Sequence, residues 1–341
     1  MTTTLWSRSK RLVFAALAFA WCVSGCKNIL PSRQSQQTLD DISLVQEWFP
    51  NCNYAGAVMA QRHFAANHHL RLKIIQGGDN VNPVALVVNG SATFGDASAD
   101  AVLLANEKGA NLVILGVVSA INPTVFVTKR ESHIQTPNDF VGHRVGILEG
   151  TNTEYVYRSL MNVNHVKRSS VKEVSVSFDI RPFIASKQYD VRPAYIYDEP
   201  VTLEIQHVDY NIIRPSDWGV HYVGTVYFAK RSYVASHPDV VRNFVYAMAD
   251  SWRAVQLHPD VAIDDLHGYD PTLDSAREAI ALNRALPFVK GVHDKVLWVE
   301  EGDLTDMVES LKSLGVLPSD FNTRSSLDLQ FIHDYYTHAE P

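Results

Sequence analysis

Apolar and polar positions along this chain follow two kinds of spacing. Strand-like segments either alternate apolar and polar residues, as in 70–74, or form a continuous apolar run, as in 112–118. Helix-like segments lie between them and stop at glycines such as Gly90 and Gly109. The first part of the chain is therefore predicted to contain strands at 43–49, 70–74, 92–96 and 112–118 and helices at 54–64, 83–89 and 99–108. This repetition of strand and helix is typical of a mainly parallel sheet with helices on both faces.

A second α/β unit is predicted to begin after the strand-like segment 124–129. Thr136 and Pro137 have the form of an N-cap followed by the first residue of a helix. Further strands are predicted at 144–148, 171–176, 193–197 and 223–229, and the last of these leads back toward the first unit. From Ser236 to the end the pattern is mostly helical. With 46% apolar residues, the chain can bury two cores of ordinary size.

The N-terminal residues have the layout of a bacterial export signal. Three cations precede the uncharged run 12–23, which is too short to span a bilayer. Val23-Ser24-Gly25-Cys26 follows, so we expect removal of residues 1–25 and attachment of two or three acyl chains to Cys26. Residues 26–40 are polar and are predicted to form a flexible tether to a domain held at a membrane surface, facing the periplasm or the cell exterior. An ordinary signal peptide cut near a chance cysteine is the alternative.

The net charge and the small number of cysteines exclude further classes of protein. The formal net charge is −7, and −10 without the leader, which does not suit nucleic acid or anionic lipid as a partner. Cys22 leaves with the leader and Cys26 would be acylated, so Cys52 stands alone and neither a disulfide nor a cysteine-based metal site is expected. The sequence contains no G-x-S-x-G, H-E-x-x-H or P-loop motif. We therefore expect no catalytic residues, no cofactor and no enzyme.

Short motifs follow one another in an order that resembles the NMT1/THI5-like substrate-binding proteins. The resemblance runs from about residue 43 to about residue 265. It rests on Glu47-Trp48-Phe49-Pro50-Asn51, Tyr54-Ala55-Gly56, Gly77-Gly78-Asp79, Phe94-Gly95-Asp96, Gly142-His143-Arg144-Val145-Gly146, Tyr197-Asp198-Glu199-Pro200, Arg214-Pro215-Ser216-Asp217-Trp218-Gly219 and His237-Pro238-Asp239-Val240-Val241-Arg242-Asn243-Phe244.

The resemblance implies an α/β fold of the type II periplasmic-binding-protein class, with two α/β lobes joined by two crossovers and a ligand between them. Lobe 1 would consist of 41–126 and 227–341, and lobe 2 of 127–226. We expect hinge motion near 124–129 and 222–229. Members of the family usually feed ABC importers of thiamine-precursor pyrimidines, and related branches carry riboflavin, sulfonates, nitrate or aromatic acids. A small planar heterocycle, an ABC permease and an ATPase are thus the implied partners.

Aromatic residues near the ends of predicted strands are candidates to bind such a ring. Trp48 and Tyr54 flank a strand-to-helix turn, where ligands of open α/β sheets bind, although core packing would also explain them. Asn51 in the same turn is either an amide partner for ring nitrogens or a turn residue. Trp218 and Tyr222, near the second crossover, are placed either to close over the ligand or to pack the lobes.

Polar candidates follow two other predicted strands. Asp96, Ser98 and Asp100 precede a helix, so one of them should cap it while Asp96 or Ser98 faces the ligand. Thr151 and Asn152 also lie between a strand and a helix, where free backbone N–H groups attract anionic groups, with a simple helix cap as the alternative.

Tyr197 and Glu199 lie near the end of a predicted buried strand. A carboxylate at this place can pair with an amino-pyrimidine, so we expect Glu199 to bind the ligand, with Tyr197 beside it. A structural salt bridge is the alternative for Glu199.

The sequence thus predicts a membrane-anchored solute-binding protein of an ABC importer. A ligand-sensing lipoprotein coupled to a membrane signalling protein is one alternative, and an importer component for a sulfonate, riboflavin or an aromatic acid is another. Lys27 permits sorting to an outer membrane, and the choice of membrane stays open. The eukaryotic pyrimidine synthases that share the fold carry a cysteine-rich iron-binding motif, which this sequence lacks.

Replacing the predicted acylation site tests the anchor. We expect Cys26→Ser to move the protein from the membrane fraction to the soluble fraction without unfolding it, because the tether separates the anchor from the domain. Fractionation after a salt wash measures the change, and the wild-type protein is the control. A Cys26→Ser protein that stays with the membrane would rule out the lipoprotein assignment.

Overall fold

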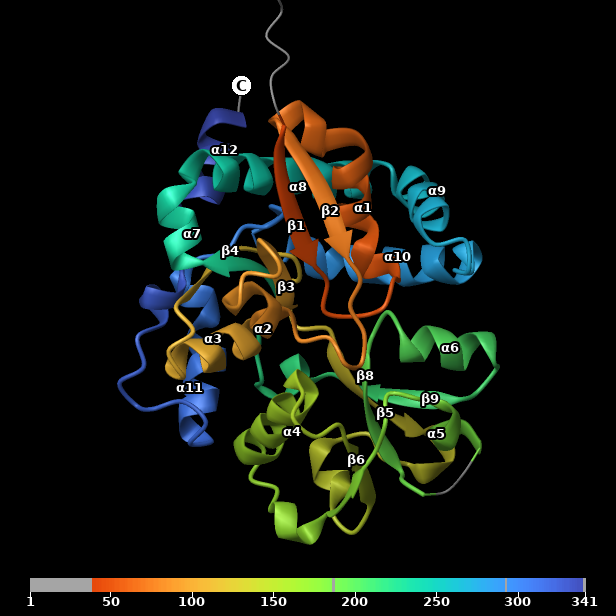
Figure 1. Ribbon diagram of the computed structural model, residues 1–341. Helices are drawn as coiled ribbons and strands as arrows, with labels where there is room; N and C mark the ends of the chain where they lie inside the picture. The colour runs from red at the N-terminus through yellow and green to blue at the C-terminus, as the bar shows by residue number, and fades with distance from the viewer. Residues whose placement is uncertain (1–38, 186–187, 292, 340–341) are drawn as a thin grey trace, which may run out of the picture. The chain divides into compact units, whose positions relative to one another are not determined.

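The computed structural model describes residues 39–185, 188–291 and 293–339 (Figure 1). The predicted signal sequence, Cys26 and the tether up to residue 38 lie outside the described residues. The segment Thr38–Pro341 forms one compact unit. Within the part of the chain that is described, no helix is long and apolar enough to cross a membrane.

The first sheet has five strands in the order β2-β1-β3-β10-β4. Its strands are β1 (Asp40–Val45), β2 (Leu70–Ile75), β3 (Phe94–Ser98), β4 (Leu112–Val117) and β10 (Thr225–Lys230). β1 pairs in parallel with β2 and β3, whereas β10 runs antiparallel to β3 and β4. The alternation predicted for β2 is present, since Leu70, Leu72 and Ile74 are buried while Arg71 and Lys73 are exposed.

The second sheet repeats this arrangement with the order β7-β6-β8-β5-β9. Its strands are β5 (Thr124–Lys129), β6 (Arg144–Ile147), β7 (Lys172–Ser175), β8 (Val191–Tyr195) and β9 (Tyr210–Ile213). β6 pairs in parallel with β7 and β8, and β5 runs antiparallel to β8 and β9. We call the first sheet with its helices lobe 1 and the second sheet with its helices lobe 2.

In each sheet the antiparallel strand is the one that enters from the other lobe. β5 follows β4 of lobe 1, and β10 follows β9 of lobe 2. A chain that arrives from the opposite lobe enters at the edge where the parallel strands end, so it must run against them. The expectation of mainly parallel sheets is confirmed, since four strands of each sheet run in one direction and only β10 or β5 runs against them. The predicted hinge at 124–129 coincides with the hydrogen-bonded strand β5, and the one at 222–229 overlaps the second connection and β10; the segments that connect the sheets are 118–123 and 219–224.

Twelve α-helices of very different length surround the sheets in the described part of the chain. They are α1 (Ala55–Met59), α2 (Pro83–Val88), α3 (Ala99–Glu107), α4 (Asn152–Val163), α5 (Arg181–Ala185), α6 (Glu199–Ile205), α7 (Arg231–Ser236), α8 (Pro238–Leu257), α9 (Pro259–Tyr269), α10 (Ser275–Lys290), α11 (Thr305–Ser313) and α12 (Gln330–Ala339). The helix predicted after Thr136 is only a short 3-10 turn, Pro137–Phe140, closed by a capping box between Thr136 and Asp139.

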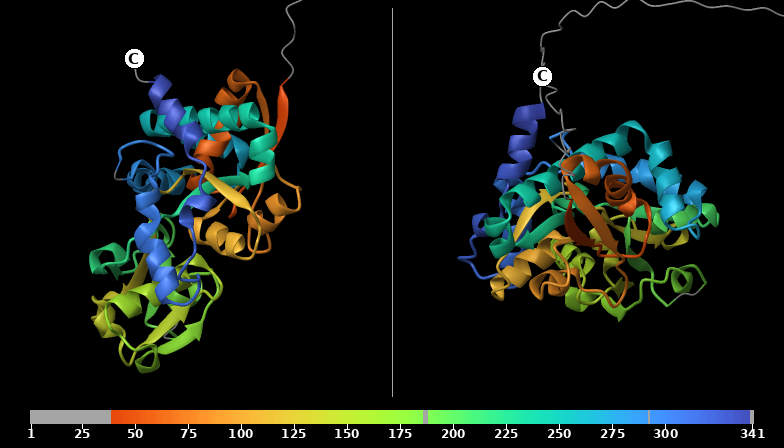
Figure 2. Two further views of the ribbon diagram at one scale, coloured as in Figure 1. Left: turned by 90° about the vertical axis from the view of Figure 1, so that its left-hand side faces the viewer. Right: turned by 45° about the horizontal axis from the view of Figure 1, so that its top comes forward.

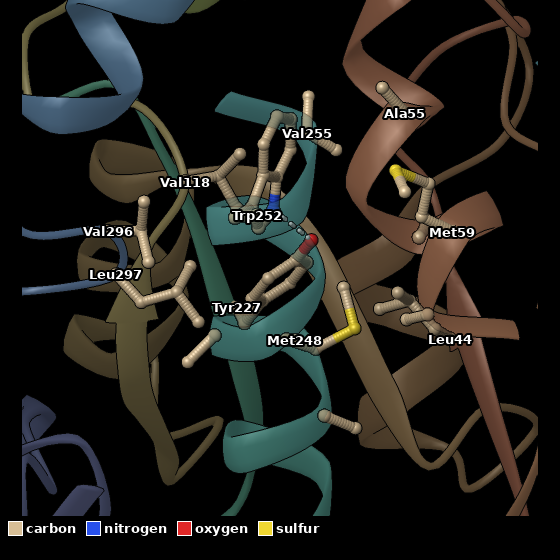
Figure 3. Packing of buried hydrophobic residues seen from close by; sticks show 14 of the residues in the cluster. Leu44, Ala55, Met59, Val118, Tyr227, Met248, Trp252, Val255, Val296 and Leu297 are labelled. Atoms are coloured by element: carbon tan, nitrogen blue, oxygen red, sulfur yellow. Dashed lines mark hydrogen bonds between the residues drawn. The ribbon is translucent and has the colours of Figure 1, made fainter. Parts of the chain in front are cut away.

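The core of lobe 1 is built around α8. Trp252 is 1% exposed, and its indole Nε1 donates a hydrogen bond of 3.1 Å to the hydroxyl of Tyr227 on β10 (Figure 3). Met59 and Val255 pack in the same apolar cluster. A Cβ atom at Gly56 would lie 2.2 Å from the Trp252 ring, so this close approach of α1 to α8 requires glycine.

A second buried apolar cluster contains residues of both lobes. It includes Val45 and Ile114 of the first sheet, Phe126 and Val145 of the second, and Val223 of a connecting segment. Near the C-terminus, α11 contacts α4 of lobe 2, and the blue C-terminal segment can be followed past the second sheet in Figure 2. The lobes are thus joined by packing as well as by the two connections.

Candidate functional site between the lobes

Three carboxylates of lobe 1 gather where β1 and β3 end. Glu47 follows β1, Asp96 lies on β3 and Asp100 lies in the first turn of α3. The backbone N–H of Glu47 donates to Oδ1 of Asp96 at 3.2 Å, which holds two of these acids together. Among the described residues, none of the three side chains forms an ion pair. We call Glu47, Asp96 and Asp100 the acidic cluster.

Burial raises the pKa of each acid in the cluster. The pKa of Glu47 rises to about 8, first through burial and then through the charge of Asp96, against a hydrogen bond from the backbone N–H of Ser98. Burial raises the pKa of Asp96 to about 7. Burial also raises the pKa of Asp100, although hydrogen bonds from Asn152 and Ser98 oppose the shift. The cluster therefore holds protons at neutral pH that a cationic ligand can displace.

Lobe 2 brings an amide and two phenols to the same place. Nδ2 of Asn152 donates to Oδ1 of Asp100 at 2.6 Å, and Oδ1 of Asn152 accepts from Nδ2 of Asn122 at 2.8 Å. Burial, and then the charges of Glu47 and Asp100, raise the pKa of Tyr195 at the end of β8. Burial and the charge of Asp100 raise the pKa of Tyr155 on α4. Both phenols thus lie close enough to the acidic cluster to sense its charge.

Aromatic rings meet beside the acidic cluster. The ring centroid of Trp48 lies 4.4 Å from that of Phe178, which belongs to lobe 2, and 5.5 Å from that of Phe49. Phe49 and Phe178 are 44% and 42% exposed, so these rings remain accessible at the boundary between the lobes. Trp48 is half-buried there, and this is the place expected from the sequence for a ring-binding residue.

Tyr54 and Asn51 shape the turn that carries Trp48. Tyr54 is 1% exposed; its hydroxyl donates to the carbonyl of Trp48 at 2.5 Å and accepts from the backbone N–H of Gly77 at 3.0 Å. Oδ1 of Asn51 accepts from the backbone N–H of Asn53 at 2.9 Å and caps the following 3-10 turn. In this structure both residues position the loop, as the alternatives to ligand contact supposed.

Glu199 does not end a strand, because β8 stops at Tyr195 and Glu199 opens α6. Its carboxylate accepts from Nη2 of Arg192 at 3.0 Å and from the backbone N–H of Tyr195 at 2.8 Å. Arg192 is fully buried and also donates to the carbonyl of Phe178 at 2.6 Å. Glu199 thereby positions Tyr195 and Phe178, and Tyr197 is buried beside them in the lobe 1 cluster.

The remaining candidates pack within the lobes. Ser98 is buried directly before α3, within hydrogen-bond reach of Asp100. Oγ1 of Thr151 donates to the carbonyl of Leu148 at 2.7 Å. Trp218 packs on α4 of lobe 2, and the hydroxyl of Tyr222 lies 2.9 Å from Oγ of Ser159 on the same helix. The structure therefore groups Trp48, Asp96, Ser98 and Asn152 near the acidic cluster. Burial and, to a smaller extent, the charge of Asp100 raise the pKa of Tyr222, so its phenol also lies close to the cluster, whereas Trp218 packs on lobe 2.

Sequence reasoning missed Glu47, Tyr195 and Phe178 as candidates. Glu47 was not considered because the first strand was expected to continue to residue 49. In the structure β1 ends at Val45, and the following residues turn toward β3. Phe178 lies in a loop after β7 with no motif of its own. The parallel pairing of β1 with β3 was the signal that could have placed Glu47 beside Asp96.

The ion pair changes what we expect of Glu199→Gln. The substitution leaves the Arg192 cation buried without its carboxylate, so unfolding free energy should fall by about 3 kcal/mol, near the lower end for a broken buried pair. The melting temperature without ligand should fall by about 6–12 °C, since ~1 kcal/mol corresponds to about 2–4 °C at this size. Glu204→Gln on the same helix is the control, because Glu204 is 46% exposed in its pair with Arg284. Equal melting temperatures for the two variants would show that the Arg192 pair does not stabilise the fold.

The acidic cluster also predicts how stability depends on pH. Since the folded-state pKa values of Glu47 and Asp96 are raised to about 8 and about 7, the folded protein binds protons that the unfolded chain has released. Their contribution to stability is complete below the usual carboxyl pKa and is lost as pH rises through about 7 to 8.

Thermal unfolding between pH 5 and pH 9 measures this dependence. We expect the Glu47→Gln, Asp96→Asn double variant to unfold at a higher temperature than wild type at pH 9, by about 2–4 °C or more, and to show a flatter profile. Glu107→Gln, at an exposed acid near the end of α3, should follow the wild-type profile. A double variant with an unchanged slope would mean that the two carboxyls are ionised in the folded protein at all these pH values.

The sequence of this chain is similar to a known protein family and to a named protein. The family model described as NMT1/THI5 like matches residues 51–262. A protein of Legionella pneumophila named 4-amino-5-hydroxymethyl-2-methylpyrimidine phosphate synthase is 22% identical over 251 residues, which cover 72% of this chain and 79% of that protein.

Solved structures with the same fold include two sulfonate-binding proteins. The periplasmic aliphatic sulphonate binding protein of Escherichia coli is 14% identical, with a TM-score of 0.67 over 85% of this chain and 92% of the other. The alkanesulfonate-binding protein of Xanthomonas axonopodis, bound to MOPS, is 14% identical, with a TM-score of 0.66 over 86% of this chain and 99% of the other.

These similarities confirm the predicted type II periplasmic-binding-protein fold, with two α/β lobes and two crossovers. The family model covers the end of the turn after β1, the acids on β3 and α3, the whole of lobe 2, all of α8 and the first turn of α9. The chain belongs to the NMT1/THI5-like family.

Proposed function

We propose that this protein is a solute-binding protein that holds a small nitrogen heterocycle between its lobes and presents it to an ABC permease and its ATPase. The ligand we favour is an aminopyrimidine of the kind from which thiamine is made. The family membership and the fold shared with binding proteins of ABC importers support the role. The acidic cluster supports the class of ligand.

The main support for the proposal is that the three acids of the acidic cluster have no cationic partner and lie at the boundary between the lobes. Aromatic rings lie at the same boundary. Glu47, Asp96 and Asp100 form no ion pair with any described residue, and Trp48 lies beside them. A protonated aminopyrimidine presents a ring N–H and an amino N–H side by side, so one carboxylate can accept both in charge-assisted hydrogen bonds. The same ring offers a flat face to Trp48 or Phe178.

Among the residues predicted from the sequence, we assign ligand contact to Trp48, Asp96, Ser98 and Asn152. The others act by positioning these groups or by packing the lobes: Asn51, Tyr54, Thr151, Tyr197, Glu199, Trp218 and Tyr222. Glu47 and Tyr195 are added as ligand contacts, because the pKa of Tyr195 is raised in part by the charge of Glu47 across the lobe boundary.

An anionic ligand fits this place less well. The two solved relatives described above are sulfonate-binding proteins, and a sulfonate carries a full negative charge. The acidic cluster offers no cation that could pair with it, and the buried guanidinium of Arg192 is already bound by Glu199 and by backbone carbonyls. We therefore propose a ligand class different from that of these relatives.

Anchoring belongs to the same proposal. Acylation at Cys26 would anchor the binding domain to a membrane, facing the periplasm or the cell exterior, close to the permease. A role as the receptor of a membrane transporter would explain why a predicted export signal and an α/β ligand-binding domain occur in one chain.

A second candidate function is synthesis of a pyrimidine phosphate, which the similarity to the Legionella pneumophila protein favours. The described residues contain a single cysteine, Cys52, which is buried, and no group of three or more metal-ligating side chains. The two functions differ in stoichiometry, since a binding protein retains at most one ligand per chain while an enzyme accumulates product.

Two experiments on purified protein test the proposal. Mass spectrometry of small molecules released on denaturation should detect a nitrogen heterocycle at no more than one per chain. In thermal unfolding, 4-amino-5-hydroxymethyl-2-methylpyrimidine at 100 times its dissociation constant should stabilise the protein by about 2.7 kcal/mol, or several degrees, whereas MOPS should give no shift.

Variants of the site make this test specific. Asp96→Asn and Trp48→Ala should each weaken pyrimidine binding by about tenfold or more, which corresponds to ~1.4 kcal/mol. Glu107→Gln should bind as wild type does. A shift with MOPS but not with the pyrimidine would assign the protein to anionic ligands, and pyrimidine phosphate in excess of one equivalent would assign it to synthesis.

A further inference from the structure

A cavity of about 540 Å³ lies at the two segments that connect the lobes. Residues 120–122 of the first connection and 220–223 of the second form part of its wall. The rest comes from lobe 2, from Phe288 on α10, from four described residues between α10 and α11, and from Asp306 on α11. None of Glu47, Asp96 and Asp100 lines it, so it is separate from the acidic cluster.

The walls of this hinge cavity are mainly apolar. Ile121, Val125, Val156, Val223 and Phe288 contribute side chains from five different elements or connections. Pockets of about 300–1,000 Å³ with such walls hold small organic molecules. The cavity therefore has the size and the lining of a ligand site.

The charges at the cavity indicate which end of a ligand lies where. Arg214 of lobe 2 is exposed at the cavity, and among the described residues its guanidinium has no ion-pair partner. The lining also contains two acids: Oδ2 of Asp303 is bonded to Nε2 of His293 at 2.7 Å, and Asp306 is the second. An anionic group would thus be attracted to Arg214 and repelled by the two acids.

We infer that the hinge cavity is a second ligand site, which binds a small, mainly apolar molecule with one carboxylate or sulfonate group at Arg214. The apolar body lies against Ile121, Val125 and Phe288. Because the wall contains both connecting segments and parts of both lobes, the occupant contacts the elements whose relative position must change when the lobes open.

A short chain of hydrogen bonds leads from this cavity to the acidic cluster. Asn122 lines the cavity and donates to Asn152 at 2.8 Å, and Asn152 donates to Asp100 at 2.6 Å. Occupancy of the cavity should therefore alter affinity at the acidic cluster, and the reverse by the same factor. This coupling rests on the proposed function, whereas binding in the cavity does not.

Two fluorescent probes that differ in one charge test the site. 1-Anilinonaphthalene-8-sulfonate is anionic, and N-phenyl-1-naphthylamine is its uncharged counterpart. We expect both to bind the full-length protein with increased fluorescence at about one per chain. Arg214→Glu should weaken the sulfonate by about tenfold and the neutral probe by less than about twofold, because the substitution changes charge and leaves the apolar walls intact.

Ile121→Trp, which places a larger side chain on the cavity wall, should weaken both probes. Arg130→Glu makes the same charge change at another exposed arginine of lobe 2 and should leave both affinities as in wild type. Unchanged affinity of the sulfonate in Arg214→Glu, or equal losses in Arg214→Glu and Arg130→Glu, would overturn the assignment. These outcomes do not depend on whether 4-amino-5-hydroxymethyl-2-methylpyrimidine binds, so failure of the hinge site and failure of the proposed function are distinguishable.

Discussion

The fold depends on the chain crossing twice between its sheets. Each crossing inserts one antiparallel strand, β5 or β10, beside parallel strands that end at the same edge. Those edges face each other, so the residues that follow β1, β3 and β8 meet between the lobes although they are far apart in sequence. The same two connections form the wall of the hinge cavity. One topological constraint therefore creates both places where we propose that a ligand binds.

The two lobes differ in whether their buried ionisable side chains form an ion pair. In lobe 2 the fully buried Arg192 binds Glu199 and the carbonyls around Phe178 through its two terminal nitrogens, which fixes the loop that faces Trp48. In lobe 1 the acids of the acidic cluster lack such partners, and burial raises their pKa values instead. The ion pair fixes geometry in lobe 2, whereas the acids of the cluster have hydrogen bonds but no cation, so a cationic ligand can supply the missing charge partner. This contrast is why we place the ligand against lobe 1 and assign Glu199 to positioning.

Family membership and site chemistry contribute different parts of the functional argument. The family and the fold are shared by proteins named for sulfonate binding and for pyrimidine phosphate synthesis, so neither determines the ligand. Our choice of ligand class therefore rests on the charges of the residues between the lobes. Glu47 and Asp96 disfavour an anion, and the aromatic rings favour a flat molecule.

The sequence by itself determined the features that depend on neighbouring residues. Alternation placed β2 and a continuous apolar run placed β4, because strand periodicity is local. The motif before Cys26 is equally local, and the export and anchoring that it indicates stay predictions. The order of motifs predicted the family and hence the two lobes. Trp48 was also identified as a ring-binding candidate from its place after a strand.

Only the tertiary structure decided which side chains meet. Glu47 and Asp96 are brought together by the pairing of β1 with β3, and Asp100 meets Asn152 across the lobes. Arg192, rather than a ligand, approaches Glu199 because α6 begins directly after the turn that follows β8. Contacts of this kind depend on strand order and on where each strand ends, and hydrophobic periodicity carries no information about either.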